Sequence, residues 1–106
     1  MHGNSKENPK SHHLYEIFDK EQDDVFKYGI SDNSFGADGL SKRIRRQLSL
    51  MNTIAGLVRY FANILLRDIP GKREASKIED EHIEAYRQKF GHPPRGNPGR
   101  QKNRLQ

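Results

Sequence analysis

Two short apolar runs separated by a polar turn constrain the fold of this chain most strongly. Residues 13–18 (HLYEIF) and 25–30 (VFKYGI) are rich in aromatic and β-branched side chains, whereas residues 19–24 (DKEQDD) are polar. Within the second run every other residue is large and apolar: Phe26, Tyr28 and Ile30. This alternation is typical of a buried strand, so the pattern predicts a β-hairpin at the start of the domain.

The apolar residues after the hairpin recur with helical spacing. They form a stripe at intervals of three or four residues: Leu40, Ile44, Leu48, Met51, Ala55 and Val58. This stripe predicts a helix that begins near Leu40. Residues 60–68 alternate in character and are closed by Pro70 and Gly71, which predicts a third strand, although residues 62–66 (ANILL) suit a continued helix equally well. A second helix is expected from about Arg73 to Phe90.

The chain has enough apolar side chains for one small domain. It contains 106 residues, of which 32% are hydrophobic, and no cysteine, so neither disulfides nor a thiolate zinc site are available to stabilise it. We expect a flexible linker at residues 1–12, a folded domain at 13–97 and a basic tail at 98–106. No apolar run approaches the about 20 residues that span a bilayer, and no signal peptide is visible, so we expect no membrane insertion. The expected fold is α+β, with a three-stranded, mostly antiparallel sheet flanked by helices.

The charges are segregated along the chain. Residues 16–24 contain five acids and one lysine, residues 42–46 (KRIRR) carry four positive charges, and residues 92–106 carry four more with no acid. Such segregation favours binding to a polyanion such as nucleic acid. A solubilising face with a disordered basic tail is the alternative interpretation.

One acid falls within an apolar stripe of the second predicted helix. Ala75, Ile83, Tyr86 and Phe90 share one helical face, and Glu79 lies four residues from both Ala75 and Ile83. A carboxylate in such a stripe is costly unless it is paired, protonated or bound to a cation. A partner arginine is one explanation, and metal ligation or acid–base chemistry is the other.

Tyrosine, arginine, glutamate and a divalent cation together suit phosphodiester hydrolysis. A cation held by Glu79 would polarise the phosphate and neutralise developing charge. An arginine would contact phosphate oxygens in bidentate fashion, and a tyrosine hydroxyl would relay a proton from the attacking water.

Several short motifs, in order, resemble the GIY-YIG (URI) nuclease superfamily, in its small toxin-domain variants from bacterial polymorphic effectors. "LYEIF" resembles the first motif strand and places its tyrosine at Tyr15, and "KYGIS" resembles the second. "LSKRIRRQ" resembles the helix with an arginine and, four residues later, a histidine, which correspond to Arg43 and Gln47. "PGKREASKIEDEHI" resembles the segment with the metal-binding glutamate, here Glu79. "GHPPRGN" resembles the terminal segment that ends in asparagine, here Asn97.

The resemblance implies a metal-dependent endonuclease toxin domain that cleaves DNA, with RNA not excluded, and uses Mg²⁺ or Mn²⁺. It also implies a monomeric C-terminal module of a secreted effector, acting in the cytoplasm of a target cell and neutralised by a cognate immunity protein. The implied catalytic residues are Tyr15, Tyr28, Arg43 and Glu79, with Glu79 as the metal ligand. The residues expected to bind substrate are Lys27, Arg46, Gln47 and Asn97.

The chain departs from the family pattern at several of these positions. Lys27 stands two residues before Gly29, where the family has its tyrosine, and Tyr28 takes the middle position. Because neighbours on a strand face opposite sides, Lys27 is expected to point into the site and Tyr28 away from it. Gln47 replaces histidine and cannot shuttle protons, and Arg46 is an alternative to Arg43 as the catalytic arginine.

A function from a different class is a non-catalytic, basic nucleic-acid-binding module. In that case Arg43, Arg45, Arg46 and the basic tail would neutralise phosphates without cleaving them. A buried carboxylate at Glu79 favours the nuclease, because a pure phosphate binder gains nothing from it.

Overall fold

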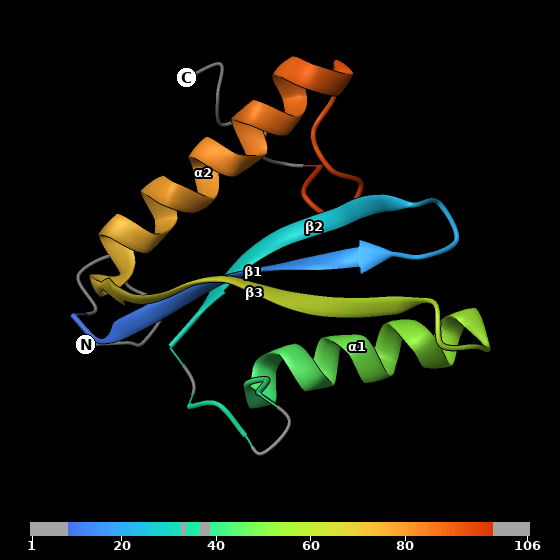
Figure 1. Cartoon of the computed structure of the whole chain (residues 1–106), viewed down its shortest axis with the longest axis horizontal. Coiled ribbons are helices and arrows are strands. Elements are labelled where there is room, and N and C mark those ends of the chain that lie inside the picture. Colours follow the sequence, from blue (N-terminus) through green and yellow to red (C-terminus); the bar gives the residue numbers. More distant parts are fainter. Residues whose placement is uncertain (1–8, 33, 37–38, 99–106) are drawn as a thin grey trace.

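The computed structural model describes residues 9–32, 34–36 and 39–98, which form a three-stranded sheet and two helices (Figure 1). Along the chain the elements are β1 (Ser11–Asp19), β2 (Asp24–Ser31), α1 (Lys42–Ala55), β3 (Tyr60–Pro70) and α2 (Gly71–Phe90). The strand order is β2-β1-β3, and both pairings are antiparallel. The predicted α+β fold is therefore confirmed. Residues 62–66 belong to β3 and do not continue the helix.

The central strand β1 divides the core into two layers. Leu14 packs with Ile69 and Ala75, the latter from α2, whereas Tyr15 and Ile17 pack with Ile44 of α1. Because Leu14 and Tyr15 are neighbours on one strand, they face opposite sides of the sheet. The two helices therefore cover opposite faces of the sheet, and the short α+β chain buries side chains on both.

Local signals explain the bounds of α1. The Ser41 side chain accepts a hydrogen bond from the backbone N–H of Ile44 and caps the N-terminus, and Gly56 ends the helix in the left-handed conformation with φ 76°. The predicted stripe packs on the sheet as expected, through Leu40, Ile44, Leu48 and Met51. Val58 does not follow the stripe and is 70% exposed, because the helix has already ended at Ala55.

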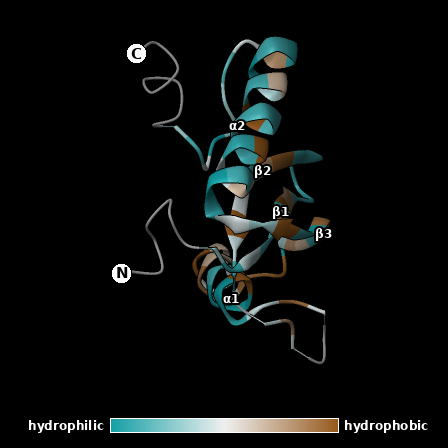
Figure 2. Cartoon of the chain, turned by 90° about the vertical axis from the view of Figure 1, so that its left-hand side faces the viewer, coloured by the Kyte–Doolittle hydropathy of each residue, from teal (hydrophilic) through white to brown (hydrophobic). Residues whose placement is uncertain are grey.

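The inner face of α2 is close to the one predicted from the sequence. Its buried residues are Ala75, Glu79, Ile83 and Tyr86, and Figure 2 shows the apolar parts of α2 on its side toward the strands. Phe90, predicted to share this face, is 48% exposed, because it is the last residue of the helix. Its ring contacts that of Tyr86 in a tilted arrangement.

A bulge in β2 interrupts the alternation that the sequence predicted for that strand. Ile17 of β1 pairs with Lys27, and Phe18 pairs with Val25, so Phe26 is an additional residue in β2. Phe26 therefore packs with the α1-side cluster, while Ile30 packs with the α2-side cluster. The expected sharing of one face by Phe26, Tyr28 and Ile30 is wrong for Phe26.

The segment after α2 docks on the outer edge of β2. The backbone N–H of Gly96 donates to the carbonyl of Phe26 at 2.8 Å, and Pro94 is fully buried. These contacts cover an edge that would otherwise present unpaired backbone groups. β1 begins at Ser11, inside the predicted linker. Residues 1–8 of that linker and residues 99–106 of the predicted tail lie outside the described residues.

Candidate functional site

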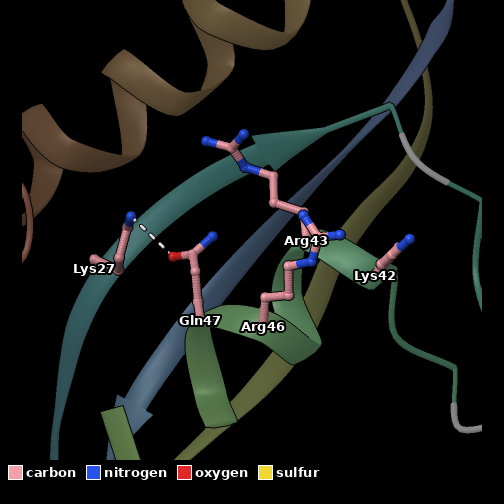
Figure 3. A pocket seen from close by; sticks show the side chains of 5 residues that line it. All are labelled: Lys27, Lys42, Arg43, Arg46 and Gln47. Atoms are coloured by element: carbon pink, nitrogen blue, oxygen red, sulfur yellow. Dashed lines mark hydrogen bonds between the residues drawn. The ribbon is translucent and has the colours of Figure 1, made fainter. Parts of the chain in front are cut away.

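A cationic pocket lies where the middle of β2 faces the first turns of α1. It has a volume of about 430 Å³, and its lining residues carry only positive charge or none: Lys27, Lys42, Arg43, Arg46 and Gln47. In Figure 3, Lys27 projects from β2 at one end of the group and Lys42 from α1 at the other, with Gln47 and the two arginines between them. Four cations around one pocket make a site for an anion.

The sequence places these cations at an electrostatically unusual point of the fold. The first turn of α1 contains no acid, although acids are the residues that favour the positive end of the helix dipole. Lys42, Arg43 and Arg46 are exposed, and none of their side chains forms a hydrogen bond or ion pair with another residue in the described part of the chain. The helix terminus and these cations add to one positive potential, which an anion would neutralise.

Gln47 connects this pocket to the sheet through both ends of its amide. The ammonium of Lys27 donates to Oε1 of Gln47 at 3.1 Å, and Nε2 of Gln47 donates to the hydroxyl of Tyr15 at 2.7 Å. An ammonium group can only donate, so the amide atom that faces Lys27 must be the oxygen. This requirement fixes the orientation of the amide, and with it the direction of the hydrogen bond to Tyr15.

The two strand tyrosines lie on different sides of the sheet. Tyr15 is fully buried in the layer beneath α1, and its hydroxyl accepts a hydrogen bond from the pocket residue Gln47. Tyr28 lines a separate crevice with His82 and Tyr86 of α2, and burial, followed by the charges of Glu16 and Asp24, raises its pKa. The structure therefore brings Lys27, not Tyr28, into the group formed by Arg43, Arg46 and Gln47. The catalytic roles predicted for the tyrosines stay predictions.

Glu79 is buried, as the sequence indicated, with 4% of its surface exposed on the inner face of α2. It is not among the described residues that line the cationic pocket, and α2 packs against the sheet face opposite to α1. The metal-binding role predicted for Glu79 stays a prediction.

The side chain of Asn97 holds the C-terminal segment on β2. Its Oδ1 accepts from the backbone N–H of Tyr28 at 2.9 Å, and its Nδ2 donates to the carbonyl of Tyr28 at 3.1 Å. Asn97 is 9% exposed and, like a strand residue, satisfies both backbone groups of its partner. This geometry positions β2, and through it Lys27. A role of Asn97 in binding substrate stays a prediction.

The predicted metal ion requires side chains that can coordinate it. Across the described residues, no three side chains of His, Cys, Asp or Glu gather into a group that could hold a metal ion. Mg²⁺ is commonly held by one or two carboxylates together with waters and substrate phosphates. Glu79 supplies one carboxylate for such a cation, from the inner face of α2, and the described residues do not form a metal cage around it.

Sequence reasoning missed an ion-pair network that fixes the far end of the sheet. Asp19, the last residue of β1, is fully buried and accepts hydrogen bonds from the guanidinium groups of Arg59 and Arg95. The hydrogen bonds from Arg59, chief among the causes, hold the pKa of the Asp19 carboxyl well below its usual range. These residues are far apart in the sequence, and the only signal for the pairing was an acid at a strand end.

The comparisons with known proteins agree with this fold. A family model described as URI fold toxin 2 matches residues 5–91. Neither a curated protein nor a solved structure matches the chain significantly. Within the part of the chain that the structure describes, neither helix combines the length and the apolar character that a membrane-spanning segment needs. The family match covers most of the chain and all five secondary-structure elements. The chain belongs to the URI fold toxin 2 family.

Proposed function

We propose that this toxin domain is a nuclease that hydrolyses phosphodiester bonds of DNA in a divalent-metal-dependent reaction, as a member of the GIY-YIG group of URI-fold enzymes. The observation that carries the proposal is the pocket lined by Lys27, Lys42, Arg43 and Arg46, which contains no acidic lining residue among those described. A polyanionic backbone is the ligand that such a pocket fits best.

The cations supply binding and charge stabilisation. The planar guanidinium groups of Arg43 and Arg46 suit bidentate contacts with phosphate oxygens, and Lys27 adds a point charge from the opposite wall. Preorganised positive charge stabilises the additional negative charge that develops on a phosphate under attack. Since both arginines line the pocket, either can be the catalytic arginine.

Glu79 would hold the Mg²⁺ or Mn²⁺ ion that the resemblance implies. When bound, such an ion polarises a phosphate oxygen and neutralises developing charge. The Glu79 side chain is buried on the inner face of α2, and carboxylate oxygens are the ligands that such a hard cation prefers. The amide of Gln47, where the family has histidine, binds Lys27 and Tyr15 and takes no part in proton transfer at neutral pH.

The toxin family also supports a proposal for the biological role of this activity. We propose that the domain is the C-terminal effector module of a bacterial polymorphic toxin, that it acts as a monomer on DNA in the cytoplasm of a target cell, and that a cognate immunity protein neutralises it. The family match supports the toxin role, and the basic pocket supports a nucleic acid as the target.

The direct test is to incubate the purified protein with plasmid DNA and with total RNA, in Mg²⁺, in Mn²⁺ and in EDTA. We expect cleavage of DNA with either metal and none in EDTA. If the protein cleaves RNA and not DNA, the substrate is RNA instead of the proposed DNA. Binding to DNA without cleavage under all conditions would contradict the nuclease and support the non-catalytic module, because the cations of the pocket suffice for that function.

A further inference from the structure

Tyr15 combines complete burial with a direct hydrogen bond to a pocket residue. Its side chain has 0% of its surface exposed, and its ring lies so close to Gly29 that a Cβ at that position would be 2.4 Å from its Cζ and hydroxyl oxygen. Only glycine leaves this space. The phenol is therefore held in a fixed place, between the strand backbone and α1.

The hydrogen bonds that start from Tyr15 lead outward to the pocket. Tyr15 accepts from Gln47, and Gln47 accepts from the ammonium of Lys27. Lys27 lines the pocket, whereas Tyr15 does not. The buried end of the chain of hydrogen bonds is rigid. The end in the pocket is the half-buried Lys27, and a lysine stem has high rotamer entropy when nothing holds it.

We propose that Tyr15 and Gln47 are positioning residues that hold the ammonium of Lys27 against a substrate phosphate, and that Tyr15 itself does not touch the substrate. This inference rests on the proposed function, because it assigns a phosphate of the nucleic acid as the ligand of Lys27. It replaces the proton-relay role expected for the first tyrosine with a role that acts through Gln47.

The chemistry of residue 47 suits this role. A glutamine is neutral, so it fixes the ammonium without cancelling its charge. A glutamate would also accept from Lys27, but its negative charge would offset that of the ammonium and repel phosphate. The amide also needs a donor-only partner on one side and an acceptor on the other, which Lys27 and Tyr15 provide.

The test measures binding of a fluorescein-labelled DNA duplex by anisotropy in EDTA over a range of salt concentrations, so that no cleavage occurs. The Lys27→Met variant should weaken binding and lower the slope of log K against log salt by about 0.9, the value for one lost phosphate contact. The Tyr15→Phe variant should weaken binding about fivefold, as expected for one lost hydrogen bond, and leave the slope unchanged.

A double-mutant cycle then tests whether Tyr15 acts through Lys27. The combined Tyr15→Phe and Lys27→Met variant should bind no more weakly than Lys27→Met alone, because a positioning residue has no effect once its target is absent. Gln47→Met should match Tyr15→Phe, and Gln47→Glu should lower the salt slope. The controls are Tyr60→Phe, which deletes another hydroxyl of the same core cluster, and Lys77→Met, which removes an exposed charge from α2.

Three outcomes would overturn the inference, each with a different pattern. If Tyr15→Phe binds and cleaves as the wild type does, the hydrogen bond has no functional role. If it binds normally but no longer cleaves, Tyr15 acts in the chemical step, and the nuclease function stands. If the wild type neither binds nor cleaves nucleic acid, the proposed function fails and the inference fails with it.

Discussion

The carboxylate of Asp19 accepts two hydrogen bonds of 2.8 Å from the guanidinium of Arg59, so the end of β1 is joined to the residue just before β3. A third hydrogen bond of 2.7 Å comes from Arg95, in the segment that covers the edge of β2. Asp19 is fully buried, while Arg59 and Arg95 keep 21% and 41% of their side-chain surface exposed. One carboxylate thus ties three separate parts of the chain together.

Removing the charge of this carboxylate should destabilise the fold without changing the cationic pocket. We expect Asp19→Asn to lower the free energy of unfolding by about 3 kcal/mol, because it breaks a buried ion pair and leaves two arginines facing an amide. Urea denaturation measures this change. The control is Glu21→Gln, since Glu21 is 55% exposed and lies 3.8 Å from Arg59. That variant should change stability by less than about 1 kcal/mol.

The same carboxylate should make stability sensitive to acid. The pKa of Asp19 is lowered in the folded state, so its contribution is complete above the ordinary aspartate pKa of about 3.9 and is lost as the pH falls below that value. Wild-type stability should therefore decrease more steeply than that of Asp19→Asn between about pH 5 and pH 2. Equal slopes for the two proteins, measured by urea denaturation at each pH, would contradict this role of Asp19.

The sequence predicted the parts of this protein that depend on local periodicity. The hairpin, the α1 stripe and the inward position of Glu79 follow from spacings within single elements. Alternation along β2 also indicated that Lys27 and Tyr28 would separate to opposite faces, as they do. Each of these patterns involves neighbours a few residues apart.

The contacts that the sequence did not predict join residues far apart in the chain, which neither helical nor strand periodicity relates. Asp19 and Arg95 are separated by 76 positions, and the partners of Gln47 lie 20 and 32 positions before it. The bulge at Phe26 is equally hidden, because it arises from the register between two strands. Sequence reasoning could therefore nominate Gln47 as a site residue, but it could not reveal that the amide connects Lys27 to a buried tyrosine.

The hydroxyl of Tyr86 should resist ionisation. It donates to Oδ2 of Asp24 at 2.7 Å, and burial, followed by this hydrogen bond, raises the pKa of Tyr86 to about 12. The neutral phenol is favoured in the folded state, so its contribution to stability is present below about pH 10 and is lost as the pH rises through the folded pKa. Tyr86→Phe should cost about 1 kcal/mol at pH 7 and flatten the alkaline decrease in stability. In an absorbance titration of this variant, the tyrosine ionisation at the highest pH should be absent.

Substitutions at two neighbouring residues of α1 should have opposite effects, one on cleavage and the other on stability. Arg43 is exposed in the pocket at the positive end of α1, so Arg43→Ala should abolish cleavage while thermal stability stays level or increases slightly. Ile44 is fully buried, so Ile44→Ala should cost about 2–5 kcal/mol through a cavity in the core. Melting temperature and plasmid cleavage are measured on both. If Arg43→Ala cleaves normally and Arg46→Ala does not, Arg46 is the catalytic arginine.

Glu79→Gln tests the metal directly, because it keeps the size of the side chain and removes its charge. A ligand that binds only the folded state raises stability by mass action, so Mg²⁺ or Mn²⁺ should raise the melting temperature of the wild type relative to EDTA. Since Glu79 is the one protein carboxylate proposed to hold the ion, Glu79→Gln should lose both this shift and the cleavage of plasmid DNA.

A matched control is Glu81→Gln, which removes an exposed acid from the same helix. If Glu79 serves only a buried ion pair, Glu79→Gln should instead lower stability by about 3–5 kcal/mol in EDTA and in metal alike. A folded Glu79→Gln protein that cleaves DNA at the wild-type rate would exclude Glu79 from the mechanism.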